Sequence, residues 1–314
     1  MPKLMSLQVN RPPLWRDVLP TPSPDADKYA RGHVPVLGAP DLTGATRLAA
    51  SACSRIGAGL VSVVATRWAD VYRASLPPQV MVWDGVLHRP KRVSVVLAGC
   101  GGADRQPLER ILARSSGCHQ VLDAGAIGAV MRPRAPTDRR RIITPHQGEF
   151  DRAFPDLGGG VETRALVASR MTASLVVLKG RETIIAAPDG RLVVDSRRSA
   201  YLATAGTGDV LAGLIAGLLA QRMPPFEACC AAVWIHAEAG IRFGPGLVAG
   251  DIVRQVPAIL SRLLAGRVSH HQFRPEEGGD GIPHPDMSDL VDVGLMPPPK
   301  SEAVAQKLLV RSCR

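Results

Sequence analysis

Short runs of β-branched residues, each closed by glycine or proline, recur along the chain and limit what it can fold into. They are LVSVVAT (60–66), RVSVVLAG (92–99), QVLDAG (120–125), RIITP (141–145) and SLVVLKG (174–180). Helical or loop segments separate most of these runs. Continuous apolar strands that alternate with helices are typical of a parallel sheet buried on both faces. The sequence therefore predicts an α/β fold.

Three further segments refine this prediction. TIIAAPDGRLVVD (183–195) holds two short strands around a Pro-Asp-Gly turn, which indicates a β-hairpin. LTGATRLAASACSRIGAG (42–59) is expected to form a helix that ends at its glycines, and two more helices are expected at about 209–222 and 225–241. HVPVLGAP (33–40) reads as a strand, but Pro35 cannot donate to a ladder. Its strand is therefore expected at a sheet edge, or the proline at a strand start.

The chain of 314 residues is long enough for one large domain or two small ones. Residues 1–27 contain six prolines and no periodicity, so we expect an extended N-terminal arm. Residues 28–265 carry the periodic segments and are expected to form the domain. Residues 266–314 are richer in proline and charge, which predicts a loosely ordered tail.

Composition excludes several classes of protein. The net charge is +10, and its densest cluster, RPRAPTDRRR (132–141), is either a solvated loop or a polyanion site; without interleaved aromatics it does not favour nucleic acid. The six cysteines form no C-x-x-C pair, so neither a zinc nor a disulfide framework is expected, and a reducing cytoplasm is the default location. The most apolar window, 210–220, is too short to cross a membrane.

One acid stands inside an otherwise small and apolar stretch, YLATAGTGDVLAGLIAGLLAQRM (201–223). Gly206, Thr207 and Gly208 precede Asp209 and could form an anion hole, in which backbone N–H groups and a helix N-terminus face a phosphate. Asp209 would then be a general base for a substrate hydroxyl. Alternatively, Asp209 only caps the helix. No P-loop motif occurs.

Two other strand ends carry polar side chains. Lys179 in VVLKGRET could lie along a polyphosphate, or it could be an ordinary surface lysine. His146 and Glu149 in ITPHQGEF are three residues apart and face one direction if a helix begins there. They could contact a substrate and hold Mg²⁺ through water, or Glu149 could only cap that helix.

These elements, in this order, resemble a known family. KYARGHVPVLGAPDLTGATRLAASACSRIGAGLVSVV, VVLAGCG, VLDAGAI, IITPHQGEF, VVLKGRETIIAAPDGR and LATAGTGDVLAGLIAGLLAQRMPPFEA are together similar to the ADP/ATP-dependent NAD(P)H-hydrate dehydratases. The resemblance spans about residues 25–265. It implies a ribokinase-like three-layer α/β/α sandwich with a mostly parallel central sheet. It also implies repair of the S epimer of hydrated NADH or NADPH by phosphorylation of the hydrate hydroxyl and elimination of phosphate.

The resemblance also implies roles for individual residues, a cofactor and partners. Asp209 would be the catalytic base, Mg²⁺ the metal, and ADP or ATP the co-substrate. A separate epimerase would act in the same pathway, and the assembly would be a homotetramer. The substrate would contact Ala45, Gly101, His146 and Asp209, and the nucleotide would contact Lys179, Gly180, Arg181, Glu182, Thr183 and Gly208. Glu149 resembles the acid that organises Mg²⁺ in related kinases.

The chain departs from the family pattern at two loops. Cys100 replaces the proline of the usual Gly-Pro-Gly, and VDSRRSAYLAT (194–204) stands where the family has an Asn- and Gly-containing turn. Two alternatives therefore stay open: a ribokinase-like ATP-dependent kinase of a small molecule, and a catalytically impaired homologue that still binds nucleotide.

Overall fold

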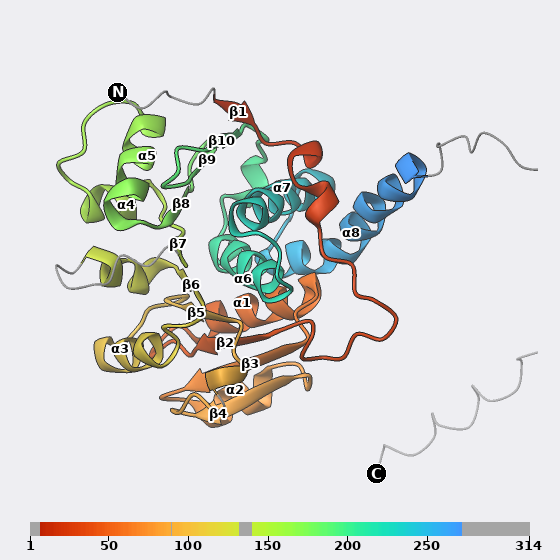
Figure 1. The fold of residues 1–314 in the computed structure, drawn as a ribbon. Coiled ribbons are helices and arrows are strands. Elements are labelled where there is room, and N and C mark those ends of the chain that lie inside the picture. Colours follow the sequence, from red (N-terminus) through yellow and green to blue (C-terminus); the bar gives the residue numbers. More distant parts are fainter. Residues whose placement is uncertain (1–6, 89, 132–139, 272–314) are drawn as a thin grey trace, which may run out of the picture. The chain divides into compact units, whose positions relative to one another are not determined.

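A ten-stranded sheet runs through the part of the chain that the computed structural model describes, residues 7–88, 90–131 and 140–271 (Figure 1). Its strands lie in the order β1-β10-β9-β8-β7-β6-β5-β2-β3-β4. Their bounds are β1 Gln8–Val9, β2 His33–Leu37, β3 Leu60–Ala65, β4 Val80–Asp84, β5 Val95–Ala98, β6 His119–Leu122, β7 Arg141–Ile143, β8 Leu175–Leu178, β9 Thr183–Ala186 and β10 Leu192–Asp195.

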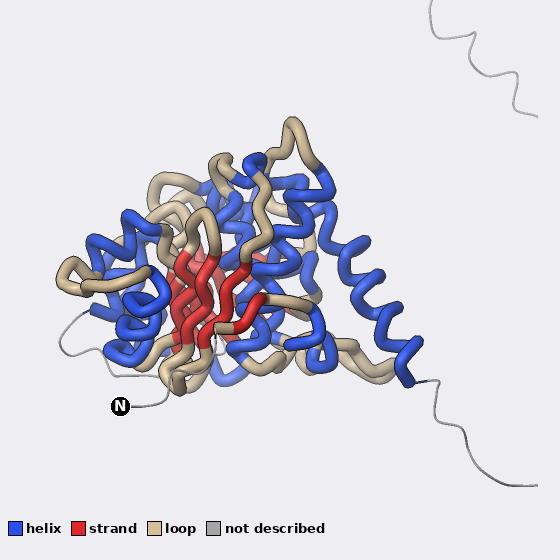
Figure 2. Tube along the Cα trace, turned by 90° about the horizontal axis from the view of Figure 1, so that it is seen from above, coloured by secondary structure: helices blue, strands red, loops and turns tan. Residues whose placement is uncertain are grey.

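Helices cover both faces of this sheet (Figure 2). One apolar core joins the sheet to α1 Thr43–Ile56, α2 Ala69–Ser75, α6 Thr207–Ala220, α7 Pro225–Phe243 and α8 Ala249–His271. A second core, on the other face, joins it to α3 Arg105–Arg114, α4 Gln147–Ala153 and α5 Val161–Thr172. Short 3₁₀ helices complete the elements: η1 Pro12–Leu14, η2 Arg16–Val18, η3 Pro90–Arg92, η4 Ala124–Met131 and η5 Ala200–Leu202.

The predicted three-layer α/β fold is confirmed. Neighbouring strands pair in parallel except around β9, which is antiparallel to both β8 and β10 and forms the hairpin expected from Pro-Asp-Gly. Strands at the centre of the sheet are buried along their whole length because successive side chains enter opposite cores. The two strands at the sheet edges, β1 and β4, were not among the expected elements.

The expectation for Pro35 was wrong. Its strand, β2, lies inside the sheet between β3 and β5. The ladder with β3 is continuous from His33 to Leu37, whereas the ladder with β5 consists of the single pair Val36 and Leu97. A residue without an N–H is tolerated inside this sheet because the pairing with β5 is this short.

Some expectations fall at the limits of the described residues. Within the arm expected at 1–27, residues 7–19 form β1, η1 and η2 and belong to the same compact unit as the domain. At the other end α8 continues past residue 265 to His271, and the tail beyond it lies outside the described residues, as do positions 132–139 of the basic cluster. None of the helices described combines the length and the hydropathy that crossing a bilayer requires.

Glycines in α6 allow it to pack closely on α1. A Cβ atom on Gly213 would lie 2.4 Å from the carbonyl oxygen of Ala49, and one on Gly217 would lie 2.2 Å from Cγ2 of Ile56. The Cys53 thiol of α1 donates to the carbonyl of Gly213 over 3.2 Å. The small residues of this stretch therefore fix the position of α6, and with it the position of the first turn that carries Asp209.

We expect Gly213→Ala to lower the free energy of unfolding by about 2 kcal/mol, because the new methyl group meets rigid backbone rather than a movable side chain. Denaturant unfolding measures the loss. Gly250→Ala in α8 is the matched control, because nothing lies within 4 Å of the added Cβ. Removing a helical glycine there is expected to stabilise by about 0.5–1 kcal/mol. Equal effects of the two changes would contradict close packing as the role of Gly213.

Candidate active site

Polar side chains from separate segments meet where several parallel strands end. Cys100 follows β5, Asp123 follows β6, Lys179 follows β8, and Asp209 lies in the first turn of α6. The carboxyl ends of parallel strands share one edge of a sheet, which is where open α/β sheets bind ligands. The fold therefore gathers into one place residues that are more than a hundred positions apart in sequence.

Lys179 and Asp123 form a largely buried ion pair. The Lys179 ammonium donates to Oδ1 of Asp123 over 2.8 Å, and the same oxygen accepts from the Thr144 hydroxyl over 2.7 Å. Burial lowers the pKa of Lys179 most, but the ion pair with Asp123 and the nearby Glu149 and Cys100 together leave the pKa above the ordinary value. Lys179 is thus a fixed positive charge at the strand ends, and the interpretation of it as a surface lysine is wrong.

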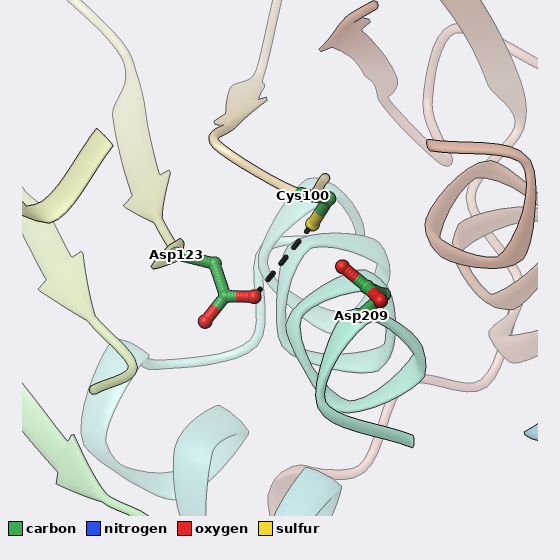
Figure 3. A group of neighbouring side chains, drawn as sticks. All are labelled: Cys100, Asp123 and Asp209. Carbon is green, nitrogen blue, oxygen red and sulfur yellow. Dashed lines mark hydrogen bonds between the residues drawn. The ribbon is translucent and has the colours of Figure 1, made fainter. Parts of the chain in front are cut away.

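Asp209 lies beside this pair. Ligand atoms of Asp209, Asp123 and Cys100 all lie within 4.8 Å of one another (Figure 3). Asp209 is not the N-cap residue of α6; that position is Gly206, and no side chain caps the helix there. The expectation that Asp209 serves only as a cap is therefore wrong, and its carboxyl group is available to the site.

The environment of Asp209 gives it the pKa of a useful base. Burial raises the pKa of Asp209 most, and the charge of Asp123 raises it further. The Cys100 thiol and the Lys179 ammonium oppose this, and the pKa of Asp209 rises from 3.8 to about 6. A carboxylate of this pKa is mostly ionised at neutral pH, yet more basic than an exposed one.

Hydrogen bonds fix the turn before Asp209, and its glycine lies close to the Lys179 ammonium. Gly206 has a left-handed backbone, with φ of 89°, and the Thr207 hydroxyl donates to the carbonyls of Leu202 and Thr204 over 2.9 and 3.1 Å. A Cβ on Gly208 would lie 3.1 Å from Nζ of Lys179. The first N–H groups of a helix lack intrahelical acceptors. The N–H groups of this turn and the Lys179 ammonium therefore provide positive charge close together.

His146 and Glu149 form a reciprocal capping box at the start of α4. Nδ1 of His146 accepts from the N–H groups of Gly148 and Glu149, and the Glu149 carboxylate accepts from the His146 N–H over 2.9 Å. His146 also pairs in parallel with Lys179 across the strand ends. The capping role expected for Glu149 is confirmed, and the imidazole of His146 remains more than half exposed.

Ala45 and Gly101 meet where the β5 loop reaches the start of α1. Gly101 has φ of 79°, and a Cβ there would lie 2.9 Å from Cβ of Ala45 and 2.5 Å from the carbonyl of Leu42. Only glycine fits this close approach. The structure thus brings together the two small residues expected to contact the substrate.

A cavity of about 540 Å³ opens next to Lys179 and Gly208. Five of the six residues expected to contact a nucleotide line it; Glu182, which pairs with Arg198, does not. Asp209, His146, Ala45 and Gly101 do not line this cavity either. Lys179 and Gly208 therefore lie on a border, with the cavity on one side and the carboxyl cluster on the other.

Several residues around the site were not found from the sequence. Asp123 ends a predicted strand, in VLDAG, but the sequence pattern assigned it no role; a carboxylate at that position was the available signal. Asp195, Arg197 and Arg198 line the cavity from the end of β10 and the loop after it, and His236 lines it from α7. Nε2 of His236 donates to the Thr207 carbonyl over 2.9 Å, and burial lowers the pKa of His236 to about 4, so its ring stays neutral. No local pattern marked these four residues.

Comparison with known proteins decides the family. The profile of the NAD(P)H-hydrate dehydratase family matches residues 34–249. An ADP-dependent (S)-NAD(P)H-hydrate dehydratase of Neisseria meningitidis is 33% identical over 267 residues, which cover 78% of this chain and 85% of that protein. This chain belongs to the NAD(P)H-hydrate dehydratase family. The family expected from the sequence is thereby confirmed.

Solved structures agree with the dehydratase fold. A ribokinase-like superfamily protein from Enterococcus faecalis has a TM-score of 0.73 at 24% identity, covering 82% of this chain and 96% of that one. The ADP/ATP-dependent NAD(P)H-hydrate dehydratase of Bacillus subtilis, co-crystallized with ATP/Mg²⁺, has a TM-score of 0.71 at 24% identity, covering 82% and 99%. The ribokinase-like architecture expected for this family member is confirmed.

Among the described residues, neither group of carboxylates near the site is arranged to hold a magnesium ion by itself. The trio of Cys100, Asp123 and Asp209 does not suit it, because burial holds the thiol protonated with a pKa well above its usual value and Asp123 is paired with Lys179. The Glu149 carboxylate already accepts the N–H of His146 in the capping box. A Mg²⁺ ion usually binds through substrate phosphates and waters with one or two carboxylates, and the described side chains are compatible with that mode rather than with an all-protein site.

Proposed function

We propose that this member of the dehydratase family restores NADH and NADPH from the S epimer of their hydrates at the expense of ADP or ATP. The observation that carries the proposal is the carboxylate of Asp209, with its raised pKa, beside the largely buried ammonium of Lys179. Lys179 and the glycine turn border a cavity large enough for a nucleotide, on the side away from that carboxylate. The nucleotide occupies the cavity, and the hydrate lies on the side of Ala45, Gly101 and His146.

The chemistry follows from this arrangement. Hydroxide is a poor leaving group, so the hydrate hydroxyl is first phosphorylated. Asp209 accepts the proton of the hydrate hydroxyl as the hydroxyl oxygen bonds to the terminal phosphorus of the nucleotide. The P–O bond between that phosphorus and the rest of the nucleotide breaks at the same time. Lys179 and the N–H groups of Gly206–Gly208 stabilise the charge on the moving phosphoryl group. Electrons from the ring nitrogen then expel phosphate, and loss of a proton from the neighbouring carbon restores the double bond.

Bound Mg²⁺ would neutralise phosphate charge. The chain's own residues do the remaining work: Asp209 moves the proton, Lys179 holds the phosphates, and the capping box with Glu149 fixes the imidazole of His146 beside the substrate. We also propose, from the family resemblance, a homotetramer and a separate epimerase that supplies the S form.

One assay tests the proposed function. The purified chain is given hydrated NADH and Mg²⁺ with ADP or ATP in turn, while the absorbance of reduced nicotinamide and the release of free phosphate are followed. We expect both to rise in step. A stable phosphate ester without reduced nicotinamide would indicate a small-molecule kinase, and nucleotide binding without any product would indicate an impaired homologue.

Lys179→Ala is expected to raise the nucleotide KM about ten- to a hundredfold, because a desolvated charge-assisted contact to phosphate is lost. The KM for the hydrate should change little. Initial rates at varied nucleotide and saturating hydrate measure this. Arg152→Ala is the matched control, since Arg152 is an exposed cation in the last turn of α4 and does not line the cavity. An unchanged nucleotide KM in Lys179→Ala would argue against phosphate contact.

The rate should also depend on pH through Asp209. A base works only when ionised, so kcat/KM is expected to rise with pH and to level off above about 6, the pKa of Asp209. Rates measured between about pH 4.5 and 8 define this limb. A midpoint near 4, roughly that of an exposed carboxyl group, would contradict the environment that the structure gives Asp209.

A further inference from the structure

The loop that follows β10 forms one wall of the 540 Å³ cavity. A buried carboxylate holds the start of this loop by a hydrogen bond. Asp195, at the end of β10, is only 2% exposed and lines the cavity together with Arg197 and Arg198. Oδ1 of Asp195 accepts the backbone N–H of Arg197 over 3.0 Å. Asp195 therefore sets the direction in which the loop leaves the sheet and places the two arginines at the cavity.

The other oxygen of this carboxylate is held from the N-terminal arm. Asn10, also 2% exposed, donates from Nδ2 to Oδ2 of Asp195 over 2.7 Å and to the carbonyl of Cys230 in α7 over 2.8 Å. Its backbone N–H donates to the carbonyl of Val194 over 2.8 Å, continuing the parallel pairing of β1 with β10. Asn10 thus joins the arm, the end of β10 and α7 at a single buried point.

Aromatic contacts close the same network on its far side. Nε1 of Trp15 donates to Oδ1 of Asn10 over 3.1 Å, and the buried Trp15 ring lies 5.8 Å from that of Trp234 in α7. The guanidinium of Arg197 lies over the Trp234 ring, 4.3 Å from its centre, and pairs with Glu238. The arm therefore reaches Arg197 by two routes, through Asp195 and through the two tryptophans.

We propose that Asn10 is a positioning residue for nucleotide binding, and that the N-terminal arm is a working part of the cavity wall through its contact with Asp195. The inference rests on the proposed function, since it takes the cavity as the nucleotide site. Asn10 does not line the cavity. It acts by holding the carboxylate that fixes the backbone of Arg197, where the loop leaves β10.

Removing the amide leaves a buried carboxylate without the donor that faces it, which disfavours the native position of the loop. We expect Asn10→Ala to weaken ADP and ATP binding about tenfold, the size of one charge-assisted hydrogen bond. The hydrate contacts lie on the other side of Lys179, so the KM for the hydrate should stay within about twofold of the wild-type value. Trp15→Phe removes the indole donor to Asn10 and part of the ring that packs against Trp234. It keeps Asn10 and should show the same selectivity with a smaller shift.

The test is calorimetric titration of the full chain with ADP and with ATP in the presence of Mg²⁺, together with the two KM values. Leu19→Val is the matched control: Leu19 is equally buried in the arm but lies in the apolar core, so it should lower stability without changing nucleotide affinity. Trp15→Phe keeps the test decisive if Asn10→Ala does not fold. Unchanged nucleotide affinity in both variants, or an equal loss in Leu19→Val, would overturn the inference. Absence of nucleotide binding by the wild-type chain would instead overturn the proposed function.

Discussion

Replacing Asp209 with Asn is expected to lower the dehydration rate between about a hundredfold and ten-thousandfold, the range that a general base contributes. The amide has the size and shape of the carboxyl group and can keep its place near Cys100 and Asp123, but it cannot take a proton from the hydrate. Nucleotide binding should persist, because the residues that line the cavity are untouched. Turnover assays and nucleotide titration of the same preparation separate the two effects.

The same change should stabilise the fold at neutral pH. The pKa of Asp209 is about 6 in the folded state and 3.8 when the carboxyl group is exposed in the unfolded chain, so ionising it costs free energy only in the folded protein. The stability that its neutral form contributes is present below pH 3.8 and is lost as the pH rises through about 6. Asp209→Asn should therefore raise the free energy of unfolding by on the order of 2 kcal/mol above about pH 6, and should hardly change it at about pH 4.

Thermal unfolding at about pH 4 and about pH 7.5 measures this gain. Asp151→Asn provides the control, because Asp151 is exposed, pairs with Arg164 at the surface and has a lowered pKa, so its removal should stabilise at neither pH. Turnover at the wild-type rate in Asp209→Asn would contradict its role as the base. Activity lost together with stability would indicate a structural role instead.

The sequence predicted the residues that local chemistry marks. Asp209 stands out as an acid in an apolar stretch, and Lys179 and His146 stand at strand ends next to glycine or proline. The carboxyl ends of parallel strands share one edge of a sheet, so the positions of Lys179 and His146 could be expected to converge there. Glu149 illustrates the limit of such reasoning. Its spacing from His146 fits both a capping box and a metal site, and only the hydrogen bonds of α4 decide between them.

Residues whose roles depend on distant parts of the chain could not be found in this way. Asp123 gains its importance from Lys179, 56 positions later, and Asn10 from Asp195, 185 positions later. The arm shows no periodicity because it contributes only a two-residue strand and two short 3₁₀ helices, which leave no repeating apolar pattern. The prediction for Pro35 failed for a related reason. A strand tolerates a proline where its pairing with the neighbouring strand is short, and the sequence of the strand itself does not show how long that pairing is.

Asp123→Asn is expected to have two opposite effects on the site. Loss of its negative charge removes a repulsion that raises the pKa of Asp209, so the acid limb of the rate profile should move below about pH 6. The same loss strips the Lys179 ammonium of its counter-charge. Without Asp123, burial lowers the pKa of Lys179 more strongly. The free energy of unfolding should fall by about 3 kcal/mol, as it does when one partner of a buried ion pair is removed.

A double-mutant cycle shows whether the two effects share one cause. If the ion pair is what Asp123 contributes, Lys179→Met combined with Asp123→Asn should recover part of the stability that either single change loses, since no buried charge is left unpaired. The acid limb of Asp123→Asn should still lie below about pH 6, because it depends on the distance between two carboxyl groups and not on folding. Additive losses of stability in the double variant would mean that the ion pair with Lys179 is not what Asp123 contributes. An acid limb that stays at about pH 6 would mean that the charge of Asp123 does not raise the pKa of Asp209.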